Sequence, residues 1–252
     1  MPARPLCIAT RNKHKLEEIR AVLAGLPLEI TNPTDYPGCP EVEEDGATLE
    51  ANAEKKAHWV CAFTGVLTLA DDSGLHVDAL AGAPGVHSAR YAGPGCSFSD
   101  NNARLLRELE GVPEERRTAR FRCVIALAEP GAAPLGPAST ASQDPPPATR
   151  PDPLPSALLP ATSGLFPAAV SLDPRFAALV RVCRVQWFDG RLEGRIATGS
   201  RGRGGFGYDP IFWIPELGCT LAELAPERKN VISHRARALA AAREALARRA
   251  SR

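Results

Sequence analysis

A short apolar run that ends in two adjacent acids constrains this chain more than any other stretch. Residues 66–70 read Val-Leu-Thr-Leu-Ala, and Asp71 and Asp72 follow directly. An apolar run of this length beside a turn signal predicts a strand covered on both faces. The next two residues, Ser73-Gly74, predict a turn before a second strand over residues 75–80. The acids therefore fall at the carboxyl end of a core strand, where open α/β sheets place their sites.

Two adjacent carboxylates repel each other and are costly to desolvate. A divalent cation relieves both problems, and hard oxygen ligands suit Mg²⁺. The alternative is a solvated Asp-Asp-Ser-Gly turn without a ligand, and the stretch alone leaves both open.

The bulk composition narrows the class of protein. The 252 residues are 44% hydrophobic, which fits one large domain or two small ones with a real core. A net charge of +1 argues against a broad nucleic-acid surface. No run approaches the ~20 apolar residues of a membrane span, and the first residues lack a signal-peptide pattern. The sequence thus predicts a cytoplasmic protein with neither nucleic acid nor membrane as a partner.

Cysteine and lysine usage adds two further indications. The seven cysteines are odd in number and show no CxxC spacing, which argues against zinc and against a disulfide framework. Only five of the 30 basic residues are lysines, and they occur in three short stretches: Lys13 and Lys15, Lys55 and Lys56, and Lys229. Lysine is a compact, movable charge that suits a phosphate; the alternative is chance clustering with a coding bias toward Arg.

The N-terminal segment predicts an anion site. A strand over residues 6–9 leads into a helix that Gly25 ends, and a second strand follows over residues 28–31. Polar and basic side chains occupy the turn into that helix: Thr10, Arg11, Asn12, Lys13, His14 and Lys15. Thr10 or Asn12 can serve as its N-cap. Free N–H groups and two ammonium groups suit a phosphate, although the P-loop pattern is absent and an ordinary capped surface helix is the alternative.

A helix predicted from about Thr48 to Phe63 directs one lysine inward. At ~100° per residue, Lys56 falls within its apolar arc and Lys55 points elsewhere. An inward lysine needs an anionic partner, either a bound phosphate or the Asp71-Asp72 pair, unless it snorkels at the helix border. Residues 43–45, Glu-Glu-Asp, precede this helix and offer a further metal ligand.

The middle of the chain predicts a helix, two strands and an insertion. Ser99 is expected to cap a helix that Gly111 ends, and residues 120–127 alternate as a strand. Residues 131–180 are rich in Pro, Ala and Ser and predict a flexible or polyproline-like insertion in a single domain. A strand over residues 182–188 follows, and Asp189-Gly190 predicts a hairpin turn.

Two C-terminal stretches suggest ligand contacts. Residues 202–207 match GxGxxG, but they lead into a strand over residues 210–214, whereas the dinucleotide fingerprint must open a helix. A ligand loop whose Phe206 stacks on a base is the better interpretation, with a mobile surface loop as the alternative. His234 and Arg235 follow the N-cap Ser233 of the last helix. The helix dipole disfavours cations there, which indicates a ligand or a surface rim pair.

Taken together, these stretches resemble the Ham1 family of noncanonical purine nucleoside triphosphate pyrophosphatases. The matching motifs are Thr10-x-Asn12-x-x-Lys15, Glu44-x-Gly46-x-Thr48 with Asn52-Ala53 and Lys56, Ala70-Asp71-Asp72-Ser73-Gly74-Leu75, Gly82-Ala83-Pro84-Gly85 with Ser88-Ala89-Arg90-Tyr91, Gly204-Gly205-Phe206-Gly207-Tyr208-Asp209-Pro210, and Lys229 with Ser233-His234-Arg235. They span the chain apart from the insertion, which is the main departure because the family joins these strands by a short hairpin.

The resemblance implies an α/β fold with an elongated mixed central sheet flanked by helices and two lobes with the active-site cleft between them, as a homodimer. It implies Mg²⁺-dependent hydrolysis of ITP, dITP and XTP to the monophosphate and pyrophosphate. Glu44 and Asp72 would bind the metal, and Asp72 would also activate the attacking water, with Lys56 as the second catalytic residue and Asp71 tuning the pair. The remaining implied residues contact the substrate: the Thr10–Lys15 stretch, Ser73, Phe206, Gly207, Tyr208, Asp209, Lys229, His234 and Arg235.

Two other functions remain open at this point. One is a Maf-like pyrophosphatase for modified pyrimidine or methylated nucleotides. The other is a nucleotide-binding protein without catalysis, against which Glu44, Asp72 and Lys56 argue.

Overall fold

The computed structural model describes residues 3–131 and 183–250. Nearly all of the predicted insertion, together with the first residue of the strand predicted from Val182, lies outside these residues.

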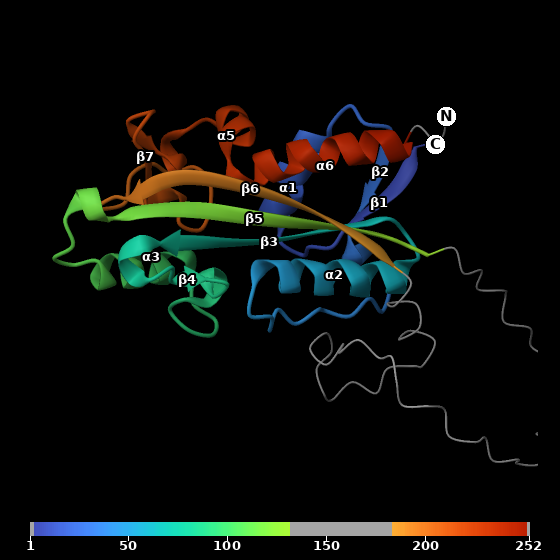
Figure 1. The fold of residues 1–252 in the computed structure, drawn as a ribbon, viewed down its shortest axis with the longest axis horizontal. Helices are drawn as coiled ribbons and strands as arrows, with labels where there is room; N and C mark the ends of the chain where they lie inside the picture. The colour runs from blue at the N-terminus through green and yellow to red at the C-terminus, as the bar shows by residue number, and fades with distance from the viewer. Residues whose placement is uncertain (1–2, 132–182, 251–252) are drawn as a thin grey trace, which may run out of the picture.

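A mixed sheet of eight strands runs the length of the molecule (Figure 1). Its order is β2-β1-β3-β5-β6-β7-β8, with β4 paired to β3. β1 is parallel to β2 and β3, and every other pairing is antiparallel. The strands are β1 (Arg4–Ile8), β2 (Leu28–Thr31), β3 (Thr68–Val77), β4 (Pro84–Gly85), β5 (Thr118–Glu129), β6 (Arg184–Ile196), β7 (Phe212–Ile214) and β8 (Cys219–Thr220).

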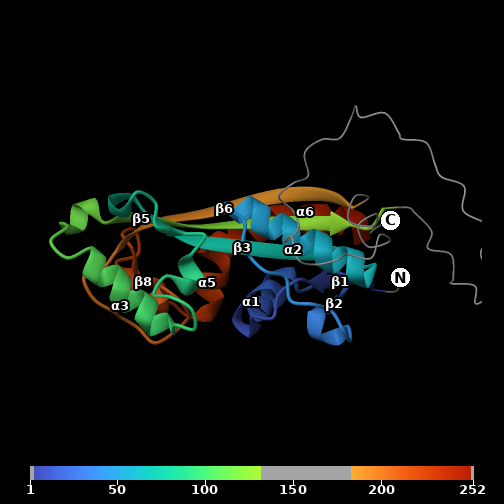
Figure 2. The ribbon, with the colours of Figure 1, turned by 90° about the horizontal axis from the view of Figure 1, so that it is seen from below.

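Helices cover both faces of this sheet (Figures 1 and 2). They are α1 (Lys13–Leu23), α2 (Leu49–Thr64), α3 (Phe98–Glu108), α5 (Pro226–Ile232) and α6 (His234–Ala250). α1 and α6 pack on one face through a core that includes Ile19, Ile125 and Leu239. α2 packs on the opposite face, where Ala57 and Val60 meet the sheet.

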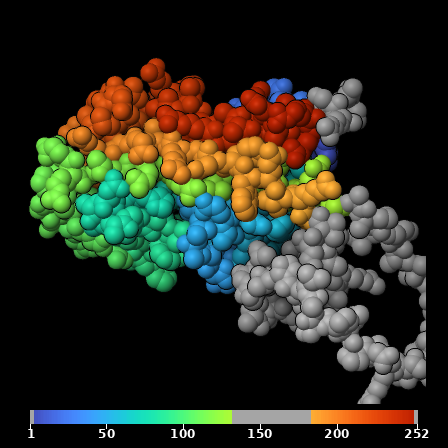
Figure 3. All heavy atoms as spheres, in the orientation of Figure 1, coloured from blue at the N-terminus to red at the C-terminus, as the bar shows by residue number. Residues whose placement is uncertain are grey.

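The far end of the three long strands forms a second lobe with its own core. Leu75, Leu105 and Phe212 are fully buried there, and they come from β3, α3 and β7. On the face shown in Figure 3, the α3 region and α2 lie side by side below β5 and β6. The expected elongated mixed sheet with helices and two lobes is therefore confirmed.

The turn predicted at Ser73-Gly74 is wrong, because β3 continues through both residues and pairs with β5 from Thr68 to Val77. The second strand predicted over residues 75–80 is instead the end of β3 followed by a 3-10 turn over Asp78–Leu80. A Cβ at position 74 would lie only 2.5 Å from the carbonyl oxygen of Gly85. Glycine is thus needed here for the close approach of β4, not for a turn.

The hairpin turn predicted at Asp189-Gly190 is wrong for the same reason. β6 runs straight through it, and a Cβ at Gly190 would collide with the backbone of His234 and Ala238 in α6. Pairing between the strands that flank the insertion is confirmed, in register from Thr118 with Arg195 to Glu129 with Arg184.

Helix caps follow local chemistry. The Asn12 side chain accepts from the N–H groups of His14 and Lys15, and Ser233 Oγ accepts from Ala236 N at the start of α6. α3 is capped by Ser97 rather than the predicted Ser99, because Ser97 and Asp100 form a reciprocal capping box.

β1 and the end of α6 lie at the same end of the molecule (Figure 1). Arg4 Nη1 donates to the carbonyl of Arg249 at 2.6 Å. No helix within the described residues combines the length and the apolar character that crossing a membrane requires.

Candidate active site

The site lies where one edge of β3 has no neighbouring strand. β1 pairs with β3 only at Thr68 and Leu69, and β4 joins it only from Leu75. In the described part of the chain, the edge between these pairings carries no strand partner. Lys56 Nζ occupies it instead and donates to the Asp71 carbonyl at 2.6 Å. A side chain thus satisfies a backbone group that a neighbouring strand would otherwise bind.

Asp71 faces α1 and α6 and is neutralised there. Its Oδ2 lies 3.1 Å from Lys15 Nζ and 3.1 Å from Arg235 Nε, and accepts from Ser73 Oγ at 3.3 Å. Burial works to raise the pKa of Asp71, but Lys15, Arg235 and Lys56 outweigh it and hold that pKa far below its usual value. This carboxylate remains charged and is fixed in position.

Asp72 points to the opposite face, as the next residue of a strand must. Its Oδ2 accepts from Asn52 Nδ2 at 3.0 Å, and its Oδ1 lies 3.8 Å from Lys56 Nζ. Burial, with Glu44 nearby, raises the pKa of Asp72 despite Lys56. The two adjacent acids therefore experience very different surroundings.

Lys56 lies between two carboxylates. Its Nζ is 2.6 Å from Glu44 Oε1 in addition to the longer contact with Asp72. Burial lowers the pKa of Lys56, but Glu44, Asp72 and Asp71 more than compensate and raise it overall. The inward direction predicted for Lys56 is confirmed.

Lys55 is also buried, although the helical wheel places it outside the apolar arc of α2. Only 3% of the residue is exposed, and its ammonium pairs with Asp45. The two neighbouring lysines thus bind two neighbouring acids of the loop before α2, and they differ in that only Lys56 reaches β3.

Asn52 links that acidic loop to β3. It was not among the predicted site residues. Its Oδ1 accepts from Gly46 N at 2.7 Å while its Nδ2 donates to Asp72, and it is almost fully buried. One amide thereby fixes both the loop that carries Glu44 and the carboxylate opposite. Its position at the edge of the apolar arc of α2 was the available signal.

Phe206 lies at the other end of the site between two aromatic neighbours. Its ring stacks on His14 with centroids 5.3 Å apart and tilts against Phe98 at 6.0 Å. Lys229 Nζ lies 4.7 Å from the ring centroid, and the Arg235 guanidinium lies 5.7 Å from it.

A buried charge network holds these cations. Lys229 Nζ contacts Asp209 Oδ2 at 2.6 Å and Glu18 Oε1 at 2.8 Å, and Glu18 also pairs with Arg235. Burial raises the pKa of Asp209 although Lys229 opposes it. Sequence reasoning missed Glu18, because an acid outside the apolar stripe of α1 resembles an ordinary surface residue.

His234 adds an unsatisfied polar atom to the wall of the site. Its ring stacks on Phe121 at 4.7 Å, and its Nδ1 is buried without a hydrogen-bond partner among the described residues. Burial, followed by Arg235 and Lys229, lowers the pKa of His234 well below its usual value, so the ring is neutral.

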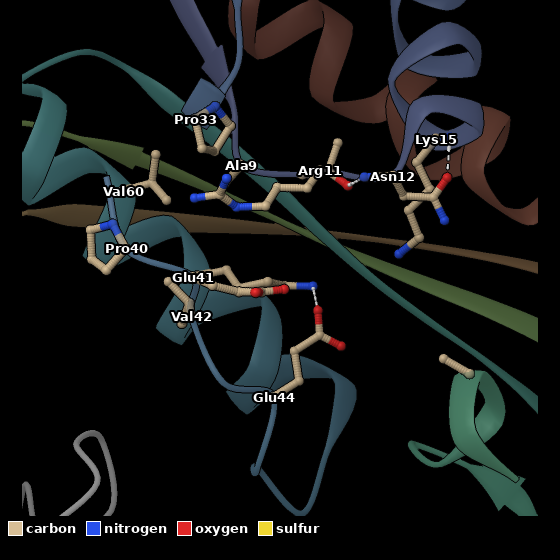
Figure 4. Close-up of a pocket in the computed structure, with 13 residues that line it drawn as sticks. Ala9, Arg11, Asn12, Lys15, Pro33, Pro40, Glu41, Val42, Glu44 and Val60 are labelled. Carbon is tan, nitrogen blue, oxygen red and sulfur yellow. Dashed lines mark hydrogen bonds and ion pairs between the residues drawn. The ribbon is translucent and has the colours of Figure 1, made fainter. Parts of the chain in front are cut away.

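Two adjoining cavities connect these groups. The first, of about 250 Å³, lies between the turn into α1 and the acidic loop; Figure 4 shows Arg11, Asn12 and Lys15 facing Glu41 and Glu44 across it. The second, of about 120 Å³, is lined by Asp72, Phe206 and Asp209 and by three C-terminal residues, Lys229, His234 and Arg235. Both cavities are lined by Asn12, Lys15, Glu44 and Ala89. They therefore form two parts of one cleft.

Most predicted site residues meet in this cleft. The first cavity takes Thr10, Arg11 and Lys56; the second takes Ser73, Gly207, Tyr208, Lys229, His234 and Arg235. Each of the three lysine stretches contributes one lysine to it. Lys13 and His14 are the exceptions among the predicted site residues, since both are exposed and line neither cavity.

Three predicted residues contribute in ways that the sequence did not indicate. The Tyr208 hydroxyl donates to the Ser88 carbonyl at 2.9 Å, so it fixes the wall of the cavity. The Gly207 carbonyl accepts from Asn102 at 3.1 Å. His14 reaches the cleft through its stacking on Phe206.

The donor set is suited to a hard divalent cation. Glu44 and Asp72 present carboxylate oxygens to the second cavity. No cluster of three or more His, Cys, Asp or Glu side chains converges within the described residues. Mg²⁺ in nucleotide enzymes uses one or two carboxylates and completes its shell with waters and phosphate oxygens. Two carboxylates beside a roomy cavity fit that pattern.

Comparison with known proteins agrees with this geometry. The family model described as "Ham1 family" matches residues 6–139 and 173–245. The chain is 46% identical over 235 residues to a dITP/XTP pyrophosphatase of Geobacter sulfurreducens, covering 93% of this chain and 92% of that protein. It is 42% identical over 241 residues to a dITP/XTP pyrophosphatase of Desulforamulus reducens, covering 96% and 94%.

Solved structures give the same result. A HAM1 protein from Coxiella burnetii superposes with a TM-score of 0.73 at 32% identity, covering 97% of this chain and 99% of that chain. A nucleoside-triphosphatase / dITP/XTP pyrophosphatase from Mycobacterium abscessus superposes with a TM-score of 0.62 at 35% identity, covering 94% and 98%.

Proposed function

This chain belongs to the Ham1 family, and we propose that it hydrolyses noncanonical purine nucleoside triphosphates, namely ITP, dITP and XTP, to the monophosphate and pyrophosphate. The observation that carries this proposal is the arrangement along one cleft. An aromatic ring beside buried cations lies at one end, and carboxylates with lysines lie where the two cavities meet.

The end of the cleft at Phe206 suits a purine with a 6-keto oxygen. The ring offers a stacking surface, and stacking is tolerant of base identity. Lys229 and Arg235 can only donate hydrogen bonds, so they favour an acceptor at the purine edge. The 6-amino group of adenine would present donors to donors, and each unpaired buried group costs about 1–3 kcal/mol. Asp209 and the neutral ring of His234 supply the remaining contacts with the base.

The junction of the cavities suits the triphosphate. The N-terminus of α1 offers free N–H groups to an anion, and Thr10, Asn12 and Lys15 stand beside it. Ser73 and Lys56 approach from β3 and α2. In this arrangement the α-phosphorus would lie near Asp72 and the leaving pyrophosphate toward the first cavity.

Glu44 and Asp72 would hold Mg²⁺, which when bound supplies positive charge to the phosphate oxygens. Asp72 orients the attacking water and accepts its proton, a task that its raised pKa favours. Lys56 keeps its positive charge between the two carboxylates and stabilises negative charge developing on the phosphates. Asp71 remains ionised and anchors Lys15 and Arg235.

The same proposal includes a single domain interrupted at residues 131–180, a homodimer and a cytoplasmic location. The strands on either side of the insertion pair directly, which supports one continuous domain. Sedimentation of the purified protein and cell fractionation test the other two points.

A pyrophosphate-release assay tests the function. ITP, dITP, XTP, GTP and ATP are compared side by side with MgCl₂ and with EDTA, and a panel of modified pyrimidine and methylated nucleotides tests the Maf-like alternative. We expect release from ITP, dITP and XTP in MgCl₂ alone. Nucleotide binding without release, or a preference for pyrimidines, would contradict the proposal.

A further inference from the structure

Four cysteines gather in the core between α2 and the sheet, and none of them lines either cavity of the cleft. Cys7, Cys39 and Cys61 are buried in one apolar cluster, and Cys183 packs against it. Among the described residues they do not converge as a metal site. The Sγ atoms of Cys61 and Cys183 are in contact, 3.6 Å apart.

The surroundings of this pair permit a covalent bond. Cys61 lies in the last turn of α2, and Cys183 directly precedes β6. Since a disulfide bond is about 2.05 Å long, the sulfurs must approach by roughly 1.5 Å. Cys183 stands outside helix and strand and can make that movement. Pro130, at the end of β5, and the last residues of α2 complete a cavity of about 210 Å³ beside both cysteines.

The two thiols differ in reactivity. Contact with Cys61 lowers the pKa of Cys183, whereas contact with Cys183 and burial raise that of Cys61. Cys183 is half-buried while Cys61 is fully buried. A reagent in the cavity therefore meets Cys183 as the more accessible and more readily ionised sulfur.

We propose that Cys61 and Cys183 are a modification site that exchanges with a low-molecular-weight disulfide, such as glutathione disulfide, and closes into a reversible protein disulfide. The Cys183 thiolate attacks one sulfur of glutathione disulfide, which forms a mixed disulfide and releases one glutathione thiolate. Cys61 loses its proton and attacks the Cys183 sulfur, which displaces the second glutathione. The protein loses two protons and two electrons, and glutathione disulfide is reduced to two glutathione molecules.

The cross-link joins residues 122 positions apart. It ties the end of α2, the helix that carries Asn52 and Lys56, to the first residue before β6. A constraint of this length acts mainly on the unfolded chain. We expect oxidation to raise the melting temperature by roughly 5–10 °C and a dithiol reductant to reverse the change.

The experiment uses the full-length protein equilibrated in glutathione buffers of graded redox potential. Free thiols are then blocked with a maleimide, counted by intact mass, and mapped by digestion without reductant. Cys183→Ser removes one partner at a half-exposed position, and Cys61→Ala removes the buried one. Cys219→Ser is the matched control, because Cys219 is also half-buried.

We expect the parent and Cys219→Ser to form one intramolecular link between Cys61 and Cys183, with the matching rise in melting temperature. Cys183→Ser and Cys61→Ala should show neither. Retention of all seven thiols in the parent across the buffer series would overturn the proposal. So would a glutathione adduct that persists on Cys183, or the same melting shift in Cys183→Ser.

Discussion

The two faces of β3 at Asp71 and Asp72 place identical side chains in opposite situations. On the face of α1 and α6, Asp71 lies against Lys15 and Arg235, and its pKa is held far below the usual value. On the α2 face, Asp72 has an amide at 3.0 Å and a more distant ammonium, and its pKa is raised. The difference shows that one acid contributes a permanent charge to the architecture while the other remains available for chemistry.

The largest effect that this comparison predicts is on stability. Asp71→Asn leaves the buried Arg235 and the partly buried Lys15 without their shared carboxylate. Removing one partner of a buried ion pair lowers the free energy of unfolding by about 3–5 kcal/mol. We expect the low end of this range because Arg235 keeps its ion pair with Glu18. Urea unfolding of the variant against the parent measures it. Equal stability of the two proteins would mean that Asp71 is not the anchor described here.

The corresponding substitution at Asp72 should reduce turnover and leave the fold intact. Asp72→Asn removes the metal charge and the base, and we expect turnover to fall at least ~100-fold, the lower end for loss of a general base. Its raised pKa means that folding disfavours the ionised form, so the melting temperature should stay level or rise slightly. Near-normal pyrophosphate release would remove Asp72 from the mechanism.

Two neighbouring lysines sharpen the contrast on the α2 face. Lys56→Ala removes the charge that touches Glu44, Asp72 and the Asp71 carbonyl, and we expect a loss in turnover of ~100-fold. Lys55→Ala breaks a pair with the half-exposed Asp45 and should change turnover by less than about three-fold. Steady-state kinetics with ITP compares them. Equal losses would contradict the distinct role given to Lys56.

A smaller effect is expected where the cleft holds the base. Phe206→Ala should weaken binding of every purine triphosphate by a similar factor, because stacking is worth ~1–3 kcal/mol per base. Changes at Asp209 or Arg235 should instead alter the ratio of ITP to ATP hydrolysis. Phe63→Ala, at another half-exposed aromatic ring, serves as the control. A Phe206→Ala enzyme that newly accepts ATP would reverse these roles.

The smallest effect is predicted away from both faces. Replacing residues 131–180 by a Gly-Asn turn should keep ITP hydrolysis within a few-fold of the parent, since loop length costs only about 0.6 kcal/mol per doubling. A nonspecific protease should cut the full-length protein there first. Loss of soluble expression, or resistance of this segment to the protease, would show that it folds with the domain.

Sequence patterns predicted most of the longer strands and helices, because periodicity and caps are local signals, and the resemblance to the Ham1 family supplied most of the predicted site residues. The patterns failed at two glycines, because a glycine in a sequence can indicate either a turn or a close approach of another backbone. Gly74 and Gly190 resemble turns in sequence, yet each is needed because another backbone passes close by. That approach depends on partners distant in sequence, which no local pattern contains.

Glu18 and Asn52 show the second limit. Glu18 lies outside the apolar stripe of α1 and Asn52 lies at the edge of the apolar arc of α2, so in sequence neither stands out from a solvated position. Their importance comes from pairing with Arg235 and Asp72, and only the tertiary arrangement reveals those partners. The opposite facing of Asp71 and Asp72, by contrast, follows from strand alternation once β3 is known to continue.

The contact between Arg235 and Asp71 also constrains the order in which a newly made chain can mature. The two residues are 164 positions apart, and α6, which carries Arg235, leaves the ribosome after every other helix of the described residues. Until then Asp71 lacks one of its two close cations, and an unpaired buried charge is strongly unfavourable. The cleft is therefore completed only once α6 has been made, and we expect a chain terminated before Arg235 to lack nucleotide hydrolysis.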